Sequence, residues 1–336
     1  MSDWRPSKLT DIVGQEALRR RLSVLVEASR IKNDALPHMV FYGPRGTGKT
    51  TFARALAHER GVNFVETTGD SVRTKEDVIR LVDEISVEGY IFDPATDAWV
   101  QTGAPIKPTI LFIDEIHRMT KDATEALYHP IEDRQVNLVK NNRLVSGILP
   151  KFTLVGATTD AGQLLTPLVT RVRMMYLEPY TEEELFRITK AHYDMDRCSQ
   201  PQMARFSDDA LRAVAQRSQG TPRLIVRNLS ELADVALVEA SDTTVSGEWV
   251  AEVMADLMGV DRHGLGALER RLLRKLVQVG KPVGIDAMAA YLGESPDNIC
   301  AAERYLQEVG AILRGPRGRE ITDIGRGLLH GTDPQE

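Results

Sequence analysis

Eight consecutive residues, Gly43–Thr50, read GPRGTGKT and have the pattern of a phosphate-binding loop. Glycines let backbone N–H groups turn inward around phosphate oxygens, and a helix that begins here points its positive end at them. Lys49 would reach the β- and γ-phosphates, and the Thr50 hydroxyl would ligate Mg²⁺. The alternative is a glycine-rich turn without a ligand. An apolar strand before the loop and a helical stretch after it favour binding of ATP and Mg²⁺. The predicted nucleotide-binding residues here are Gly43, Pro44, Gly46, Thr47, Gly48, Lys49, Thr50 and Thr51.

Two carboxylates, Asp114 and Glu115, follow the apolar run Thr109–Ile113. Neighbouring strands of a P-loop sheet bring such an aspartate beside Mg²⁺, so Asp114 is a predicted metal ligand. Glu115 would then polarise the attacking water as general base. The alternative for an acidic pair at a strand end is a helix N-cap. Residues 114–117 also resemble the DEAH box of helicases, but nothing downstream indicates the second motor domain of that family.

A third strand end reads Gly156-Ala157-Thr158-Thr159. A hydroxyl or amide at this place can bind the attacking water or the γ-phosphate. The alternative is an ordinary strand-end turn, and only the first two motifs make the functional interpretation preferable.

The chemistry needs elements that bring these strand ends to one edge of a sheet. An apolar strand, a glycine turn and a helix in that order begin an α/β unit, and short apolar runs between charges indicate buried parallel strands. We therefore predict an α/β P-loop domain over residues 1–179, a parallel sheet with helices on both faces. The expected elements are helices over 18–28 and 51–60 and strands over 38–42, 109–113 and 152–157.

The pattern changes at Pro179-Tyr180, after which residues 180–258 read as an all-helical domain. Thr181 with Glu184 forms a capping box, and Ser207 is a plausible N-cap. Thr221-Pro222 begins a further helix, with proline at its first position.

Residues 259–331 have the plan of a winged helix, which is a variant of helix-turn-helix. Helical stretches are expected over 268–277 and 285–292 and from Ser295 to about Val309. Two short strands then surround Gly315-Pro316-Arg317-Gly318.

Composition excludes several classes of protein. The net charge is −6, which argues against coating nucleic acid by bulk charge, but residues 261–331 hold 11 Lys/Arg and 9 Asp/Glu and are mildly basic. No apolar run approaches the roughly 18 residues needed to span a bilayer, and no signal core begins the chain. The two cysteines have no metal-site spacing. A reducing cytoplasm is the simplest expectation.

The motifs together resemble the RuvB family of AAA+ ATPases, the motors of Holliday-junction branch migration. The resemblance covers essentially the whole chain in order. It is carried by Arg5-Pro6, Val13-Gly14-Gln15, Gly43–Thr51, Leu111–Arg118, Phe152–Thr159, Gly220–Arg223, Gly284–Asp286, Leu292–Glu294 and Gly315–Arg319. It implies a hexameric ring that hydrolyses ATP and translocates duplex DNA in recombination and repair.

Site residues carry over by position. The resemblance implies that Trp4 and Arg5 pack on the adenine end and that Thr159 is sensor 1, possibly with Thr158. Arg171 matches the arginine finger, which must reach a neighbouring subunit's γ-phosphate; a surface ion pair is the alternative.

The resemblance also assigns residues beyond the sheet. Tyr180 matches an interdomain tyrosine near the nucleotide, and Arg223 matches sensor 2; its alternative is a solvated arginine. Arg314, Arg317 and Arg319 match wing residues that contact DNA phosphates, and the alternative is a solvated basic turn.

Three internal segments of the chain depart from the family. Residues 89–108 are an insert, which could be a hairpin or a partner surface. The hairpin over 135–149 is shortened, so docking of a standard RuvA subunit, the family's junction-binding partner, is in question. Val169, Val172 and Arg173 replace the residues usual around the finger.

Two other functions fit parts of the sequence. A clamp-loader or initiator-type ATPase shares the P-loop, the Asp-Glu pair and both sensors, but it would carry a collar or an origin-binding helix instead of a basic wing. A nucleotide-dependent DNA-binding scaffold would show no DNA-stimulated turnover.

Overall fold

A five-stranded parallel sheet organises residues 6–180 of the computed structural model. The structure describes residues 6–86, 90–93, 98–101, 108–140, 143–149, 151–200, 203–240 and 244–329. The strand order is β9-β1-β8-β5-β2, and every neighbouring pair is parallel. The strands are β1 (Met39–Tyr42), β2 (Asn63–Thr68), β5 (Thr109–Asp114), β8 (Phe152–Thr158) and β9 (Arg173–Tyr176). The three predicted strands are confirmed, and β2 and β9 are added to them.

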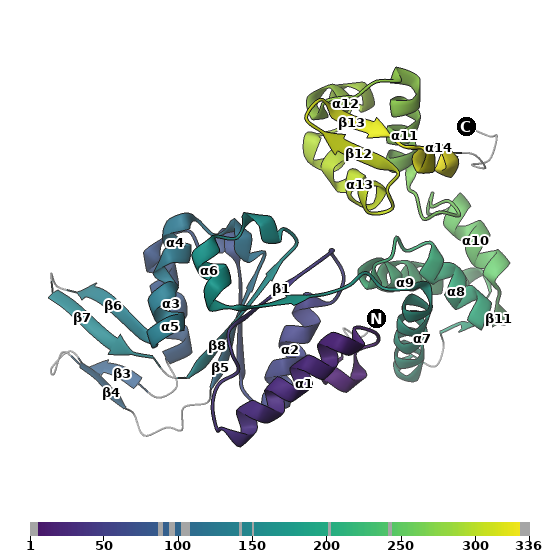
Figure 1. Cartoon of the computed structure of the whole chain (residues 1–336). Helices are drawn as coiled ribbons and strands as arrows, with labels where there is room; N and C mark the ends of the chain where they lie inside the picture. The colour runs from purple at the N-terminus through teal and green to yellow at the C-terminus, as the bar shows by residue number, and fades with distance from the viewer. Residues whose placement is uncertain are drawn as a thin grey trace. The chain divides into compact units, whose positions relative to one another are not determined.

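Helices cover both faces of the sheet, as expected for a doubly wound α/β domain (Figure 1). Helices α1 and α2 lie on one face, and α3 to α6 lie on the other (Figure 1). Their bounds are α1 (Glu16–Ile31), α2 (Lys49–Arg60), α3 (Lys75–Ser86), α4 (Lys121–Ala126), α5 (Tyr128–Asp133) and α6 (Thr166–Arg171).

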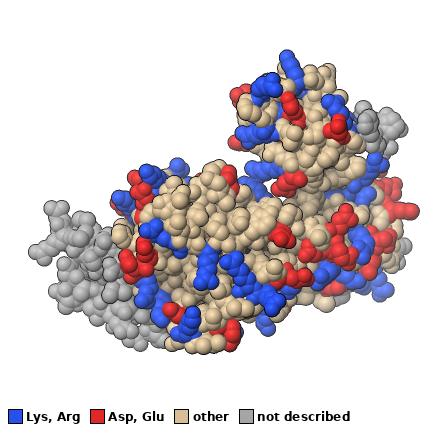
Figure 2. Space-filling view, viewed as in Figure 1, with Lys and Arg blue, Asp and Glu red and all other residues tan. Residues whose placement is uncertain are grey.

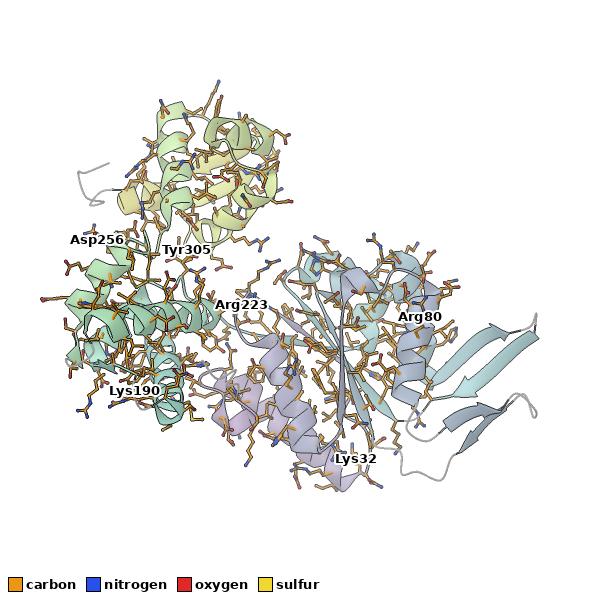
Figure 3. The ribbon with its side chains drawn as sticks, turned by 180° about the vertical axis from the view of Figure 1, so that it is seen from behind. Lys32, Arg80, Lys190, Arg223, Asp256 and Tyr305 are labelled. Carbon is orange, nitrogen blue, oxygen red and sulfur yellow. The ribbon has the colours of Figure 1, made fainter. Side chains whose placement is uncertain are left out.

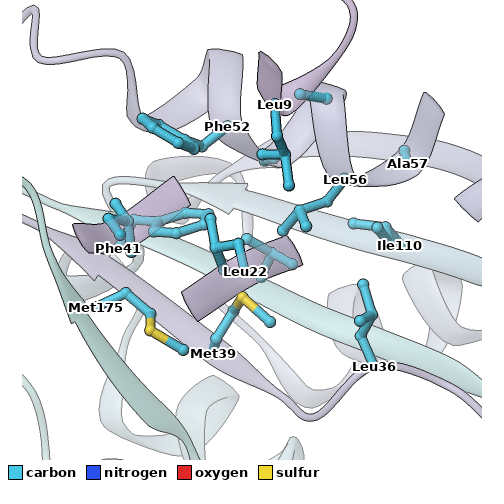
Figure 4. Close-up of a cluster of buried hydrophobic side chains, with 14 of the residues drawn as sticks. Leu9, Leu22, Leu36, Met39, Phe41, Phe52, Leu56, Ala57, Ile110 and Met175 are labelled. Atoms are coloured by element: carbon cyan, nitrogen blue, oxygen red, sulfur yellow. The ribbon is translucent and has the colours of Figure 1, made fainter. Parts of the chain in front are cut away.

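Alternation along each strand explains why the sheet has a hydrophobic core on each face. In β5, Ile110 and Phe112 join the core beneath α1 and α2, whereas Leu111 and Ile113 join the other core. Successive side chains of a strand point to opposite faces, so a fully apolar run fits a strand buried on both sides. Figure 4 shows the first core, in which Leu22 of α1 and Phe52 of α2 lie over the strands.

Residues 181–329 form a second compact unit, described here by itself. Its first part is a helical lid with α7 (Glu182–Ser199), α8 (Asp208–Gln216), α9 (Pro222–Glu239) and α10 (Gly247–Asp256). The capping box of Thr181 and Glu184 and the Ser207 N-cap are both present, as predicted. The expectation of an all-helical region is corrected in one detail, since the two-residue strands β10 (Arg205–Phe206) and β11 (Thr244–Val245) pair in parallel.

The rest of this unit has the predicted winged-helix plan. Three helices precede a two-stranded antiparallel wing, and a short C-terminal helix that the sequence did not predict follows it. The elements are α11 (Ala267–Val279), α12 (Ile285–Leu292), α13 (Pro296–Glu308), β12 (Ile312–Gly315), β13 (Gly318–Ile321) and α14 (Asp323–Leu329). The lid and the winged helix have separate hydrophobic clusters within this one compact unit.

The first unit also contains two β-hairpins that are not part of the five-stranded sheet. Strands β3 (Tyr90–Asp93) and β4 (Ala98–Gln101) pair within the insert, so the hairpin interpretation of that segment is confirmed. Strands β6 (Gln135–Lys140) and β7 (Arg143–Ile148) form the second hairpin, directly after α5. In the described part of the chain, no helix is both long enough and apolar enough to cross a membrane.

Candidate active site

The loop after β1 has the backbone conformation that the P-loop motif predicts. Gly43, Gly46 and Gly48 have φ angles of 141°, 76° and 94°, a region that L side chains rarely adopt. A Cβ on Gly43 would lie 2.4 Å from the carbonyl oxygen of Leu177, so the loop also depends on close approach to the chain after β9. Both constraints allow only glycine at this turn.

Lys49 begins helix α2 and is buried, with 8% of its surface exposed. Its Nζ donates hydrogen bonds to the carbonyl oxygens of Gly43 at 2.9 Å and Pro44 at 2.6 Å. The ammonium therefore lies inside the loop that would surround the phosphates. Thr50 and Thr51 are the next residues of α2, and within the described chain no side chain caps this helix at Gly48. The first N–H groups of α2 are thus placed to bind an anion.

Two contacts attach other segments to the loop. The hydroxyl of Tyr180 donates to the carbonyl oxygen of Thr47 at 3.0 Å, which places this predicted nucleotide-proximal tyrosine beside the P-loop. Gln15 binds the backbone of Glu178 in both directions, with its Nε2 donating at 2.6 Å and its Oε1 accepting at 3.1 Å. The segments before and after the sheet are therefore clamped together. Trp4 and Arg5 lie outside the described residues.

Asp114 ends β5, as predicted, but β5 does not neighbour the P-loop strand. Strand β8 lies between β1 and β5, which corrects the expectation that their strands are adjacent. The Asp114 Oδ1 accepts a hydrogen bond from the backbone N of Glu115 at 3.0 Å. Glu115 itself has a φ of 47°, and a Cβ on Gly69 would lie 2.3 Å from its carbonyl oxygen. Glycine at position 69 therefore lets the chain after β2 approach the backbone of Glu115 closely.

The Glu115 carboxylate lies within a polar cluster drawn from three segments. Thr159 donates to it twice, from its backbone N at 3.2 Å and from its hydroxyl at 3.1 Å. The Nδ1 of His117 lies 3.3 Å from the carboxylate, and Arg45 of the P-loop lies 3.7 Å from it. The predicted base and the predicted sensor 1 are thus in direct contact.

His117 is a site residue whose role the sequence did not predict. Its Nδ1 also makes a 2.8 Å hydrogen bond with the hydroxyl of Thr158, a threonine that is fully buried. The imidazole therefore links the strand end of β8 to the glutamate. Its place two residues after Glu115 in the Asp-Glu-Ile-His segment was the available signal, because the turn after β5 folds back over the strand end.

Thr50 and Asp114 fit the Mg²⁺ ion that a P-loop requires. Mg²⁺ prefers oxygen ligands and commonly binds one or two protein side chains, the remaining ligands being water and substrate phosphates. A hydroxyl at the start of α2 and a carboxylate at the end of β5 supply this chemistry, and the backbone of Glu115 fixes the carboxylate. No group of three or more His, Cys, Asp or Glu side chains in the described residues would hold a metal ion without such phosphates.

The predicted arginine finger, Arg171, ends α6 and contacts residues of its own chain. Its guanidinium makes a salt bridge with Glu132 at 2.8 Å, donates to the carbonyl oxygen of Pro167 at 3.0 Å and lies over the ring of Tyr128, 4.9 Å from its centroid. Burial raises the pKa of Tyr128, and Arg171 partly offsets this. The surface ion pair considered as the alternative is thus present in the single chain.

Two of the residues that hold Arg171, Glu132 and Tyr128, belong to α5, which is itself fixed to the sheet. His38 accepts a hydrogen bond from the backbone N of Leu154 at 2.8 Å and also binds the backbone of Ile131 in α5. Burial lowers the pKa of His38, which favours the neutral ring that can accept this bond. The position of Glu132 and Tyr128 is therefore set by the core rather than by a loop.

Arg223, the predicted sensor 2, lies in the second unit. It is the second residue of α9 and its side chain is exposed (Figure 3). Thr221 is the N-cap, and proline occupies the first helical position, as the sequence predicted.

The wing presents two of its three predicted DNA contacts to solvent. Arg314 and Arg317 are exposed, at the end of β12 and in the turn. Arg319 is only 4% exposed, and its Nε binds the buried carboxylate of Glu303 in α13 at 2.5 Å. Arg319 thus differs from the other two predicted DNA contacts, because its guanidinium is buried and anchors the wing to α13. On the face in Figure 2, basic side chains lie along the outer edge of the winged helix.

Together, the P-loop sheet, the Asp-Glu strand end and the wing define an AAA-class ATPase with a winged-helix domain. The model of the AAA ATPase family matches residues 39–180, and the model of the RuvB C-terminal winged helix domain matches residues 262–330. The chain belongs to the RuvB family. It is 37% identical over 333 residues to the Holliday junction branch migration complex subunit RuvB of Synechococcus sp. strain CC9311, covering 97% of this chain and 85% of the relative.

Other relatives agree. The corresponding RuvB subunit of Ligilactobacillus salivarius is 35% identical, with 95% of this chain and 89% of the relative covered. Among solved structures, the RuvB Holliday junction branch migration motor of Thermotoga maritima is 31% identical and has a TM-score of 0.78, covering 98% of this chain and 99% of that one. The similarity therefore extends across both compact units.

Proposed function

We propose that this protein is an ATP-driven DNA motor that moves the branch point of Holliday junctions during recombination and repair. The observation that carries the proposal is the contact between Glu115 and Thr159 beside a complete P-loop, in a chain that also bears a basic wing. The wing favours this function over that of a clamp loader or an initiator.

The site residues have distinct roles in hydrolysis. The P-loop N–H groups and Lys49 hold the phosphates, and Thr50 and Asp114 hold Mg²⁺, which supplies charge neutralisation at the phosphate oxygens. Glu115 accepts the proton of the attacking water, and Thr159 orients that carboxylate or the water. Tyr180 and Arg223 contact the nucleotide and so make the position of the lid depend on the nucleotide state. Trp4 and Arg5 pack on the adenine end.

The partners follow from this function. A ring of like subunits, hexameric in our proposal, lets Arg171 complete the neighbouring site. Duplex DNA binds the wing through Arg314 and Arg317. The relatives are named as subunits of a Holliday junction branch migration complex, which supports a RuvA-like partner that presents the four-way junction.

Hydrolysis measured with and without DNA tests the proposal. We expect four-way junction DNA to stimulate ATP turnover more than linear duplex of equal length, with Lys49→Ala as the blank in each case. A motor couples turnover to its track, whereas a scaffold does not. Turnover that DNA leaves unchanged would contradict the motor and favour a loader or scaffold.

The exposed wing arginines give a separate prediction. Arg314→Ala and Arg317→Ala should each weaken duplex binding at all sequences and reduce the slope of log K against log salt by about 1, because each removes one phosphate contact. Arg319→Ala should instead lower the thermal unfolding midpoint, since it leaves the buried Glu303 without its partner. Fluorescence anisotropy in a salt series and thermal melts measure the two effects. A salt slope unchanged in both exposed variants would remove the wing from the DNA interface.

A further inference from the structure

The chain passes from the lid to the winged helix through a short turn, Asp261–Leu265, whose first residue is half-buried and whose last residue is buried. Met258 and Val260, just before the turn, pack against the lid core. Leu265, at its end, is fully buried in the winged-helix core. The two hydrophobic cores are thus joined by a short turn rather than by a long flexible linker.

The side chain of Asp261 stabilises the turn through hydrogen bonds to its backbone. The Asp261 Oδ1 accepts hydrogen bonds from the backbone N of His263 at 2.8 Å and of Leu265 at 2.9 Å. The backbone N of Asp261 donates to the carbonyl oxygen of Leu265 at 3.0 Å, which closes the turn. Only 13% of the Asp261 side chain is exposed, so water competes weakly for these bonds.

The winged helix holds the turn from one side. Arg270 of α11 donates from Nη1 to the carbonyl oxygens of Leu265 at 2.7 Å and Gly259 at 3.1 Å. Tyr305 of α13 donates from its hydroxyl to the carbonyl oxygen of His263 at 3.3 Å. These donors come from two helices of the domain that bears the wing (Figure 3 labels Tyr305).

The lid holds the same turn from the other side. Gln219 donates from Nε2 to the carbonyl oxygen of Gly264 at 2.7 Å. A Cβ on Gly264 would lie 2.9 Å from the carbonyl oxygen of Arg217, so glycine is required for this contact. Burial lowers the pKa of Arg217, an effect that the nearby Asp261 carboxylate partly offsets.

Gln219 lies in the segment that also positions Arg223. It has a φ of 48°, an uncommon conformation for a residue with a side chain. The segment is stiffened at Ser218, whose hydroxyl donates to the carbonyl oxygen of Val214 at 2.6 Å and accepts from Asn228 of α9 at 3.1 Å. Gln219, which donates a hydrogen bond to the turn, is thus four positions before Arg223, the predicted sensor 2.

We propose that Gln219 and Asp261 are positioning residues of a rigid joint that makes the lid and the winged helix move as one body. The role of the joint rests on the proposed function. In that function Arg223 moves when the bound nucleotide changes, and the rigid joint transmits this movement of the lid to the DNA-bound wing. A lid movement would otherwise be absorbed between the two cores.

The two natural cysteines allow a direct test of the joint. Cys198 is exposed on α7 of the lid, Cys300 is partly exposed on α13, and the chain has no others. Spin labels on both, with labelled protein diluted into a Cys198→Ser/Cys300→Ser background, report the distance within one subunit. We expect a narrow distance distribution in the parent and a broadened one in Gln219→Ala and Asp261→Asn. Gln216→Ala, at an exposed position of α8, is the matched control and should stay narrow. A broad parent distribution, or variants as narrow as the parent, would overturn the joint.

Coupling is tested in the same variants. Basal ATP hydrolysis and duplex affinity of Gln219→Ala should stay within about two-fold of the parent, as for a residue outside the site. Stimulation by junction DNA should fall by about five-fold or more, the size of an ordinary coupling between two sites. Stimulation retained in full would contradict the coupling role. If junction DNA fails to stimulate the parent itself, the proposed function fails, and the distance distributions still decide the joint.

Discussion

Glu115→Gln should bind ATP as tightly as the parent while its steady-state hydrolysis falls by about 10²- to 10⁴-fold, the usual contribution of a general base. The amide keeps the size of the side chain and can still accept hydrogen bonds from Thr159, which reach the carboxylate at 3.1 and 3.2 Å. It does not take a proton from water. Nucleotide binding and turnover are therefore expected to separate.

Binding of a fluorescent ATP analogue and single-turnover hydrolysis together measure this separation. Glu125→Gln is the matched control, because Glu125 lies on α4 at the surface and pairs only weakly with Lys121 at 3.8 Å. Substantial hydrolysis by Glu115→Gln would show that another group activates the water. Loss of ATP binding would instead assign Glu115 to the integrity of the loop, through its 3.7 Å contact with Arg45.

Arg171→Ala should lower hydrolysis by about 10³- to 10⁵-fold without loss of ring assembly, which is the effect of an arginine that stabilises transition-state charge. In the single chain the guanidinium pairs with Glu132, whose side chain is 54% exposed. An exposed pair of this kind stabilises the fold by only about 0–1 kcal/mol, so a neighbouring γ-phosphate can displace it. The ion pair holds the Arg171 side chain at the surface, and breaking it to bind a neighbouring γ-phosphate costs little free energy.

Mixed rings decide whether Arg171 acts on a neighbour. Lys49→Ala subunits lack a working P-loop but keep the arginine, so mixing them with Arg171→Ala subunits should restore part of the hydrolysis, because some interfaces then hold one intact residue of each kind. Arg173→Ala, at the exposed start of β9, is the control and should stay close to the parent. Failure of any rescue, with rings still forming, would count against action in trans.

Local rules carried much of the fold and of the site. Glycine is the residue for positive φ, so GPRGTGKT after an apolar strand predicted the P-loop backbone that is observed at Gly43, Gly46 and Gly48. Helix starts followed from hydroxyl caps and first-turn prolines, as at Thr181 and Pro222. Each rule depends only on residues within one or two turns of the chain, so neighbouring residues in the sequence determine the outcome.

The tertiary structure decided what depends on residues far apart in sequence. Periodicity marks a strand as buried but does not order it, so the insertion of β8 between β1 and β5 came only from packing. The same reason separates Arg319 from Arg314 and Arg317: an arginine pattern in a turn indicates charge, while the partner 16 residues away in α13 decides which guanidinium is buried. The sequence by itself determined the phosphate loop, the acidic strand end and the domain plan. Only the packed chain brought Thr159 to Glu115 and Gln219 to Gly264, because such contacts form between separate elements.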